Sequence, residues 1–176
     1  MKLNSELKPE QVTAIIDSRE QTPLDLTPLR TITKGLPTAD YSVLGLEDVI
    51  AIERKSLPDF IACCGVERER FEREIQRLLA YPVRAIVVEA RWRDLENGGW
   101  RSKVTPAAAV GSALGWVAQG VPVVMCDDHA RASRFVSRLH YISARRRWRE
   151  ARALVGNIIE AETPDAEPET TETVAT

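Results

Sequence analysis

The chain has 176 residues, of which 44% are hydrophobic and 28% are charged, a composition typical of one soluble domain with a packed core. No run of about 18 apolar residues is present, so we expect no membrane-spanning helix, and the polar first residues lack the apolar stretch of a secretory signal. The net charge of −2 argues weakly against a nucleic-acid partner, but the last sixteen residues hold five acids and no base, which leaves 24 bases and 21 of the 26 acids in the rest.

This uneven charge divides the chain into two parts. Residues 1–160 carry the apolar pattern and are expected to form a single domain. Residues 161–176 are rich in Pro, Glu and Thr, and a segment that polar does not bury enough apolar surface to fold. We expect this acidic tail to be disordered.

The first expected strand is Val12–Asp17, with the sequence VTAIID. Residues 21–38 contain three prolines and one glycine, which favour a loop with a short strand at Thr31–Thr33. The N-terminal part of the chain is therefore expected to contribute strands joined by a loop.

Two short β-type runs follow, DYSVL at residues 40–44 and VIAIERK at residues 49–55. The residues between them predict a β-hairpin with a four-residue loop at Gly45–Asp48. In such a hairpin the numbers of paired residues sum to 93, so Tyr41 is expected opposite Ile52.

The second half of the chain alternates helices with strands. Ser56 is expected to cap a short helix that ends at Gly65, and residues 67–80 have an apolar stripe at helical spacing that ends before Pro82. The later elements are a buried parallel strand, a polar loop holding Trp92 and Trp100, a helix rich in small residues, a strand and a long basic helix, at residues 85–89, 90–105, 106–120, 121–126 and from 128 onward. This order predicts a mixed α/β fold with a central sheet flanked by helices.

The hairpin register also brings charged side chains together. It places Asp40 opposite Glu53, and directly opposed side chains share a face with Cβ atoms about 4.5–5.5 Å apart. Lys55 lies two residues beyond Glu53 and points to that face, whereas Arg54 points to the other. We therefore expect Asp40, Glu53 and Lys55 to form one cluster.

This cluster has two interpretations. A hard divalent cation such as Mg²⁺ takes one or two carboxylates together with waters and phosphate oxygens, and a nearby lysine can orient the attacking water or stabilise charge on the phosphate. These groups are what metal-assisted phosphodiester hydrolysis requires. In the alternative, Lys55 simply neutralises two surface acids at a strand end. The register alone favours neither.

Three motifs extend the pattern: DSRE at Asp17–Glu20, ADY at Ala39–Tyr41 and ERKSLPD at Glu53–Asp59. Their order and distances resemble the Asp-x-x-Glu, Gly-Asp and Glu-Arg-Lys-x-x-x-Asp motifs of the XPF-type structure-specific nuclease family. The segment ERERFEREIQRLLAYPVRAIVVE is similar to the arginine-bearing helix and buried strand of that family, and the likeness runs from about Val12 to about Tyr141. The resemblance implies a restriction-endonuclease-like core, a mixed central β-sheet flanked by helices.

The resemblance also implies roles for single residues. It implies a site for Mg²⁺ or Mn²⁺ whose ligands are Asp17, Asp40 and Glu53. The implied catalytic residues are Glu20, Asp40, Glu53, Lys55 and Asp59.

Two departures from the family pattern stand out. Ala39 occupies the position of the family's glycine, and the tandem helix-hairpin-helix module of many members has no counterpart in the sequence. The chain therefore resembles a stand-alone catalytic domain of a phage or bacterium. We expect it in the cytoplasm of a bacterial cell or of a phage-infected host.

Some of these residues have a structural alternative. Asp17 can act as a turn residue that bonds its own backbone, and Glu20 can pair with Arg19. Asp59 stands three residues after Ser56, where an acid completes a capping box and complements the helix dipole.

Five arginines are candidates for contacts with DNA: Arg54, Arg70, Arg73, Arg146 and Arg149. Arg54 matches the arginine of the family motif, although strand alternation favours its pairing with a nearby acid. The alternative for the arginines after residue 67 is a solvated helix face with weak ion pairs. In residues 144–152, five arginines surround Trp148, a pattern that favours either nucleic-acid contact or a basic amphipathic helix docked on the core or a second subunit.

The expected function is that of a metal-dependent DNA endonuclease. It would hydrolyse phosphodiester bonds at branched, flapped or junction DNA during repair, recombination or the processing of replication intermediates. The alternative is a catalytically silent DNA-binding scaffold with the same fold, and a weaker one is a sequence-specific restriction-type nuclease. The resemblance implies a homodimer, for which residues 106–120 and the helix from Asp128 offer faces. We expect no membrane partner and no small-molecule substrate.

Overall fold

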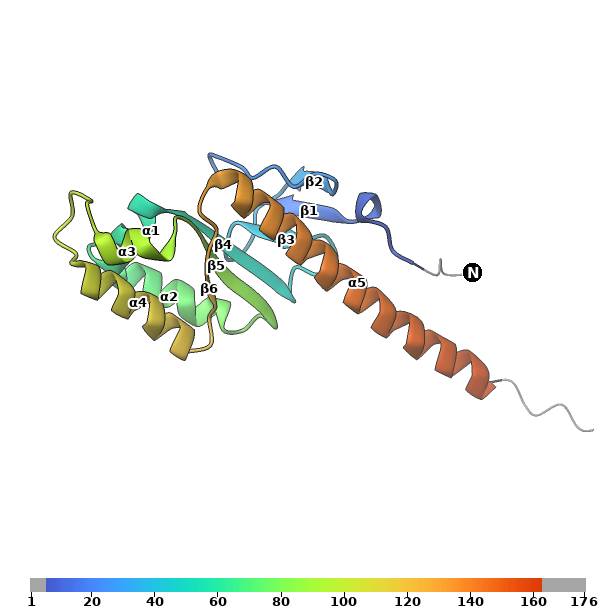
Figure 1. Ribbon diagram of the computed structural model, residues 1–176. Coiled ribbons are helices and arrows are strands. Elements are labelled where there is room, and N and C mark those ends of the chain that lie inside the picture. Colours follow the sequence, from blue (N-terminus) through green and yellow to red (C-terminus); the bar gives the residue numbers. More distant parts are fainter. Residues whose placement is uncertain (1–5, 163–176) are drawn as a thin grey trace, which may run out of the picture.

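The structure, a computed structural model, describes residues 6–162. Six strands form one mixed sheet with helices on both faces (Figure 1), as the sequence predicts. The strands are β1 (Thr13–Ile16), β2 (Arg30–Thr33), β3 (Tyr41–Val43), β4 (Ile50–Ser56), β5 (Val83–Glu89) and β6 (Val123–Met125). The helices are the short 3-10 helix η1 (Pro9–Gln11), α1 (Leu57–Cys64), α2 (Arg68–Leu78), α3 (Trp92–Asn97), α4 (Pro106–Ala118) and α5 (His129–Glu162).

The strand order across the sheet is β2-β1-β3-β4-β5-β6. β3 lies between β1 and β4 and is antiparallel to both. β2 runs parallel to β1, and β4, β5 and β6 run parallel to one another. Tyr41 pairs with Ile52, which confirms the predicted hairpin register. β3 ends at Val43 and β4 begins at Ile50, so the connection between them is longer than the predicted four residues.

Each face of the sheet has its own hydrophobic core, because successive strand residues point to opposite faces. On one face, α1, α2 and α4 cover Ala51 and Ile86, and the ring of Trp116 packs edge-on against Phe60 and Phe71 with centroids 5.5 and 4.9 Å apart. On the other face, α5 covers the alternate residues of the same strands.

Local signals set the helix starts near the end of β4. Oγ of Ser56 accepts the backbone N–H of Asp59 at 3.3 Å and caps α1, and Pro58 lies in the first turn, where no N–H is needed. Thr105 caps α4 in the same way through the N–H of Ala108 at 3.2 Å. The cap at Ser56 is the one expected from the sequence, whereas the cap at Thr105 was not predicted.

The segment between β5 and α4 is not a loop throughout. Residues Trp92–Asn97 form α3, so the prediction of a loop was wrong there. Asp94 accepts the backbone N–H of Arg91 at 2.8 Å, which stabilises the helix start. After α3, Gly98 and Gly99 have φ angles of 73° and 101°, a backbone that glycine adopts without strain, and they turn the chain toward α4.

α5 crosses the second face of the sheet and then continues beyond the body of the domain (Figure 1). It ends at Glu162, two residues past the expected end of the folded domain, and residues 163–176 of the predicted acidic tail lie outside the described residues. Within residues 6–162, no helix is long and apolar enough to cross a membrane.

Candidate active site

The predicted cluster of Asp40, Glu53 and Lys55 lies where β4 ends. We call these three residues the carboxylate–lysine cluster. Glu53 and Lys55 alternate with core residues in β4 and share the face of Ala51, which α1, α2 and α4 cover. Arg54 points to the α5 side. The sequence thus predicted the division of these charges between the two faces.

Asp40 is held by the end of the hairpin. Its backbone N–H donates to the carbonyl of Ile52 at 3.1 Å, and its Oδ2 accepts the backbone N–H of Arg54 at 2.8 Å. The side chain thus takes the place of a strand carbonyl, and this fixes its position. The preceding Ala39 has a φ of 62°, a left-handed conformation that explains why the motif has glycine at this position.

Glu53 and Lys55 form a partly desolvated ion pair. Glu53 is 4% exposed and its Oε1 accepts a hydrogen bond from the ammonium group of Lys55. That ammonium group also lies 5.2 Å from the centre of the Phe71 ring, a cation–π contact with α2. These two contacts hold the lysine over the same face as the carboxylates.

The titration of the cluster reflects burial and charge. Burial, the largest influence, raises the pKa of Asp40 to about 6, although the hydrogen bond from the backbone of Arg54 lowers it. Burial and then the charge of Asp40 raise the pKa of Glu53 to about 7. Burial lowers the pKa of Lys55, but the charge and hydrogen bond of Glu53 raise it by more, so the ammonium form is favoured.

Asp17 lies where β1 ends and is 1% exposed. Its backbone N–H donates to the carbonyl of Asp40 at 2.8 Å, so the two acids are neighbours in the fold. Its Oδ1 accepts the backbone N–H and Nε of Arg19 at 2.9 and 2.6 Å, and its Oδ2 accepts the N–H of Leu36 at 2.6 Å. Burial raises the pKa of Asp17, but these hydrogen bonds lower it by more, and the carboxyl stays ionised.

The chemistry of the donors fits a divalent cation at two of the three predicted ligands. Glu53 is buried and Asp40 is half-buried, their carboxylates repel each other, and a hard cation relieves such repulsion. Asp17 would have to release Arg19 or Leu36 to join them. In the arrangement of residues 6–162, no three His, Cys, Asp or Glu side chains form a group that could hold a metal ion.

Arg54 links β4 to the start of α5. Its guanidinium group lies 2.8 Å from Oε1 of Glu89 and 3.5 Å from Oε1 of Glu20, and the side chain is 12% exposed. Nδ1 of His129 lies 2.7 Å from the same oxygen of Glu89. Glu20 therefore pairs with Arg54 and not with Arg19, and Arg54 pairs with acids as strand alternation predicts.

Asp59 belongs to the start of α1. Its Oδ2 accepts the hydroxyl of Ser56 at 2.5 Å, while its own N–H donates back to Oγ of Ser56. Among the described residues it makes no hydrogen bond to the carboxylate–lysine cluster. Its contacts are those of a helix cap, one of the two roles expected from the sequence.

Glu74 was missed in the sequence as a residue of the site. Its Oε1 accepts the backbone N–H of Ala39 at 3.4 Å and the hydroxyl of Thr38 at 3.2 Å, and Arg77 pairs with its other oxygen at 3.2 Å. Its charge also raises the pKa of both clustered carboxyl groups. The alternating Glu and Arg of α2 carry no signal for this role, because only the packing of α2 on the sheet distinguishes Glu74 from its neighbours.

The five arginines predicted to contact DNA lie in different surroundings. Arg54 is half-buried and pairs with two acids. Arg70 pairs with a glutamate at 2.5 Å on α2, and Arg73 is exposed on the same helix. Arg146 pairs with a glutamate at 3.0 Å on α5, and Arg149 is exposed three residues later. Of the five, Arg54 alone is bonded to the cluster, through its backbone.

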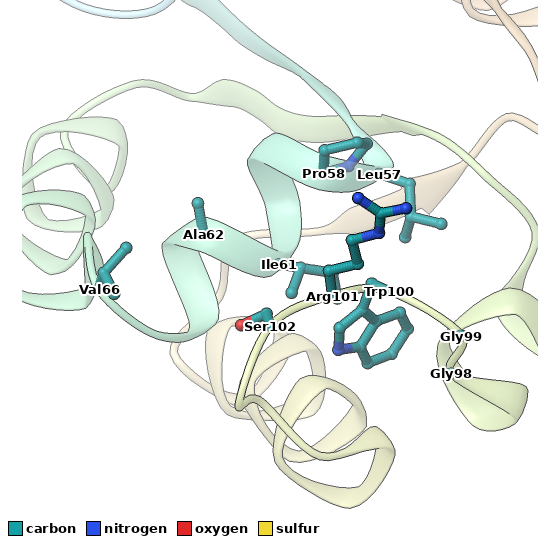
Figure 2. Close-up of a pocket in the computed structure, with 10 residues that line it drawn as sticks. All are labelled: Leu57, Pro58, Ile61, Ala62, Val66, Gly98, Gly99, Trp100, Arg101 and Ser102. Carbon is teal, nitrogen blue, oxygen red and sulfur yellow. The ribbon is translucent and has the colours of Figure 1, made fainter.

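A cavity of about 590 Å³ opens beside α1 (Figure 2). Figure 2 shows α1 on one side and residues 98–102 on the other, with the side chain of Arg101 reaching toward the start of α1. Nε1 of Trp100 donates to a backbone carbonyl at 2.7 Å, which fixes this ring in the wall. α1, which forms one wall of the cavity, begins two residues after Lys55. Its lining is mainly apolar: Leu57, Pro58, Ile61, Ala62, Val66, Gly98, Gly99, Trp100, Arg101 and Ser102.

Comparisons with known proteins agree with this geometry. The sequence profile of the ERCC4 domain matches residues 11–139, more than half of the chain. Two similar solved structures are XPF from Aeropyrum pernix, with 22% sequence identity and a TM-score of 0.63, and XPF from Aeropyrum pernix in complex with DNA, with 21% and 0.62. Each similarity covers 76% of this chain, which spans only 62% and 65% of the two solved chains. A comparison with curated protein sequences finds no significant match.

The similar folds confirm the restriction-endonuclease-like core that the resemblance implies. The matched residues run from η1 into α5 and include all three motifs with the carboxylate–lysine cluster. The chain therefore belongs to the ERCC4 domain family, as an XPF-type nuclease domain.

Proposed function

We propose that the protein is a divalent-metal-dependent DNA endonuclease that hydrolyses phosphodiester bonds at branched, flapped or junction DNA. The observation that carries the proposal is the carboxylate–lysine cluster, in which the buried Glu53, the half-buried Asp40 and the cationic Lys55 lie together where the inner strand β4 ends. Membership of the ERCC4 domain family supports the nuclease class, and the relative solved in complex with DNA supports DNA as the substrate. The proposed setting is a bacterial or phage-infected cytoplasm, where such DNA arises in repair, recombination and replication.

Asp40 and Glu53 would hold the cation, Mg²⁺ or Mn²⁺, through carboxylate oxygens. When bound, such an ion lowers the pKa of a water ligand and neutralises charge that develops on the phosphate. Binding would also favour the ionised form of both carboxyl groups, whose pKa values are now raised by burial and repulsion.

Lys55 would stabilise charge on the reacting phosphate. Glu53 orients the ammonium group and favours its protonated form, so Lys55 can donate hydrogen bonds to phosphate oxygens as their charge grows. A role for Lys55 as a general base would need the neutral amine, which the adjacent carboxylate disfavours. The surroundings of Lys55 thus support an electrostatic role.

The cavity beside α1 supports a preference for DNA with an unpaired strand. Its apolar lining and the fixed ring of Trp100 suit a nucleobase that has left the stack, and Arg101 suits the phosphate beside that base. An unbranched duplex offers no such base. A flap or fork offers one next to the bond that is to be cut.

A cleavage panel with Mg²⁺ tests this function on duplex, single-stranded, flap, fork and four-way DNA. The wild-type protein should cut flaps or forks faster than duplex, and Trp100→Ala should reduce that difference. Glu53→Gln should lower the cleavage rate at least about 100-fold. DNA affinity should be kept, since the side chain of Glu53 is buried within the cluster. Cleavage by Glu53→Gln at the wild-type rate would show that the site is assigned wrongly.

Thermal unfolding separates this function from that of a silent DNA-binding scaffold. A cation at 100 times its dissociation constant stabilises a folded protein by about 2.7 kcal/mol. Mn²⁺ should therefore raise the melting temperature of the wild-type protein and leave that of a double variant, Asp40→Asn with Glu53→Gln, unchanged. No shift in the wild-type protein, together with no cleavage of any DNA in the panel, would favour the scaffold.

We also propose that the protein acts as a homodimer. Leu114 and Val117 on α4 are 53% and 47% exposed, in the segment of small residues expected to offer a subunit interface. Sedimentation velocity at micromolar concentration should show a dimer that Leu114→Lys dissociates. A strict monomer would contradict this part of the proposal.

A further inference from the structure

One side of α5 carries a row of arginines. At 100° per residue, six of them fall within a sector of roughly 60° on the helix surface. We call these six residues the arginine stripe: Arg131, Arg134, Arg138, Arg145, Arg149 and Arg152. The residues of α5 buried against the sheet, such as Ala132, Val136 and His140, lie on the other side of the helix. The stripe therefore faces away from the sheet, and all of its members except the half-buried Arg145 are exposed.

The positive charge of α5 is poorly compensated. Residues 129–158 hold eight arginines and a single acid, Glu150. Glu150 pairs with Arg146 and Arg147, both at 3.0 Å, and neither of these belongs to the arginine stripe. The one acid of this stretch therefore forms its ion pairs with arginines outside the stripe.

Within the stripe, three arginines have no protein partner. Arg134, Arg138 and Arg149 form no hydrogen bond or ion pair through their side chains within residues 6–162. Arg131 pairs with two aspartates just before α5, and Arg145 stacks on the ring of Tyr141 at 5.3 Å. Unpaired guanidinium groups in a row are held in place by the helix and are free to bind anionic groups.

The stripe begins near the strand ends where the carboxylate–lysine cluster lies. His129, the first residue of α5, contacts Glu89, which contacts Arg54, whose backbone N–H bonds Asp40. From these strand ends α5 crosses the sheet and leaves the body of the domain (Figure 1). At about 1.5 Å per residue, the stripe is about 32 Å long, close to one turn of B-form DNA at about 34 Å.

We propose that the arginine stripe binds the phosphate backbone of a duplex DNA arm that leads away from the active site. This inference rests on the proposed function and names the part of the substrate that α5 holds. Guanidinium groups bind phosphate oxygens in a bidentate manner, and each such contact releases counterions from the DNA. A straight, one-sided row of charges matches the regular phosphates of a stiff duplex better than those of a flexible single strand.

The test compares two triple variants with equal loss of charge. The stripe variant is Arg134→Gln, Arg138→Gln and Arg149→Gln. The control variant is Lys8→Gln, Arg30→Gln and Arg147→Gln, whose basic side chains are exposed but lie before η1, on β2 and beside the stripe. Glutamine keeps a high helix propensity, and circular dichroism checks that the helix content of each variant is unchanged.

Binding is measured by fluorescence anisotropy in EDTA, with a fork whose duplex arms have about 20 base pairs, from about 50 to about 300 mM salt. Each phosphate contact contributes about 0.9 to the slope of log affinity against log salt, so the stripe variant should lose about 2.7 from the slope and at least tenfold in affinity near 100 mM salt. The control variant should keep the wild-type slope within about 1. A wild-type slope in the stripe variant, or an equal loss in both variants, overturns the proposal.

Arm length gives a second readout. The stripe spans about nine base pairs at about 3.4 Å each, so wild-type protein should bind arms of about 20 base pairs at least fivefold more tightly than arms of about 5. The stripe variant should lose this difference, and its persistence overturns the proposal. The proposal is also overturned if the stripe variant keeps the wild-type affinity for DNA but loses binding to vesicles with about 30% anionic lipid. That result would assign the stripe to membranes. Because the binding assays contain EDTA and no metal, their results do not depend on whether the protein cuts DNA. If no DNA of the cleavage panel is cut, only the nuclease function is contradicted.

Discussion

The backbone N–H of Arg54 donates to Oδ2 of Asp40 at 2.8 Å, so one carboxylate both completes the β-hairpin and belongs to the carboxylate–lysine cluster. A side chain with both tasks requires variants that separate its charge from its hydrogen bond. Asparagine keeps an acceptor oxygen at this position and removes the charge. Alanine removes both.

Asp40→Asn should lose most cleavage and gain stability. Burial raises the pKa of Asp40 to about 6, and a carboxyl with a raised folded-state pKa loses stabilising free energy as the pH rises from about 4 through 6. Removing the charge should therefore raise the free energy of unfolding at neutral pH by about 2–3 kcal/mol. Asp40→Ala should be about 1–3 kcal/mol less stable than Asp40→Asn, because the N–H of Arg54 is left without an acceptor. Urea unfolding in EDTA measures both, and equal stability of the two variants would refute the dual role.

Ala39→Gly should stabilise the protein. The left-handed backbone at Ala39 costs about 1–2 kcal/mol for a residue with a Cβ, which exceeds the roughly 0.8 kcal/mol lost with the buried methyl group. We expect a gain of up to about 1 kcal/mol, or about 2–4 °C in melting temperature. Ala51→Gly is the matched control, because Ala51 is equally buried in an ordinary strand, and it should destabilise the fold by at least about 1 kcal/mol. A lower melting temperature for Ala39→Gly would contradict the prediction.

Arg54→Met should destabilise the fold without a direct effect on phosphate binding. Arg54 is the shared cation of Glu20 and Glu89, and its removal leaves two partly buried carboxylates, at a cost of about 2–4 kcal/mol. Arg146→Met removes an exposed ion pair and should cost far less stability than Arg54→Met. The slope of log DNA affinity against log salt should be unchanged in Arg54→Met. A fall of about 0.9 in that slope would instead show a phosphate contact by Arg54.

Ser56→Ala and Asp59→Asn should separate capping from catalysis. Loss of the Ser56 hydroxyl removes the cap of α1 and should cost about 1 kcal/mol of unfolding free energy. Asp59→Asn keeps an acceptor for that hydroxyl, so we expect cleavage within about threefold of wild type, whereas a general acid or base would contribute about 10²–10⁴-fold. Rate measurements under single-turnover conditions distinguish these outcomes, and a loss of 100-fold would assign Asp59 to the chemistry.

His140 should make the protein less stable in acid. It is fully buried, and neither ring nitrogen has a hydrogen-bond partner among the described residues. Burial lowers its pKa from 6.5 to about 3, so below pH 6.5 the unfolded chain binds a proton that the folded protein does not. Stability should fall by about 2 kcal/mol between pH 7 and pH 5 through this group. His140→Leu should remove that part of the pH dependence. Urea unfolding measures the stability of both proteins at each pH, and an equal fall in stability between pH 7 and pH 5 would disprove the assignment.

Features with a short period along the chain were predictable from the sequence. Alternation along β4 assigned Glu53 and Lys55 to one face and Arg54 to the other, and the spacing of the two runs placed Tyr41 opposite Ile52. The capping role of Ser56 was equally legible. These features depend on backbone geometry within a few residues, which the order of residue types reveals directly.

The short helix α3 and the hydrogen bonds accepted by the carboxylate of Asp17 were harder to predict. Polar residues around Gly98 and Gly99 favour a loop, and the six residues of α3 are too few for a clear helical period. Asp17 matches a metal-ligand position of the motif, yet its Oδ2 is bonded to the N–H of Leu36, 19 residues further on. A motif states which residue type is present, but the surrounding loop decides what its oxygens contact.

The sequence by itself therefore determined the register of the β3–β4 hairpin, the Ser56 cap of α1 and the members of the carboxylate–lysine cluster. Only the tertiary structure decided that Glu74 reaches Ala39, 35 residues away, and that Arg149 faces away from the sheet while Arg146 is paired beside it. The physical reason is that a helical pattern leaves the rotation and docking of a helix open among several similar charged positions. The packing of two cores against one sheet settles that rotation, and with it which of several glutamates or arginines meets the site or the solvent.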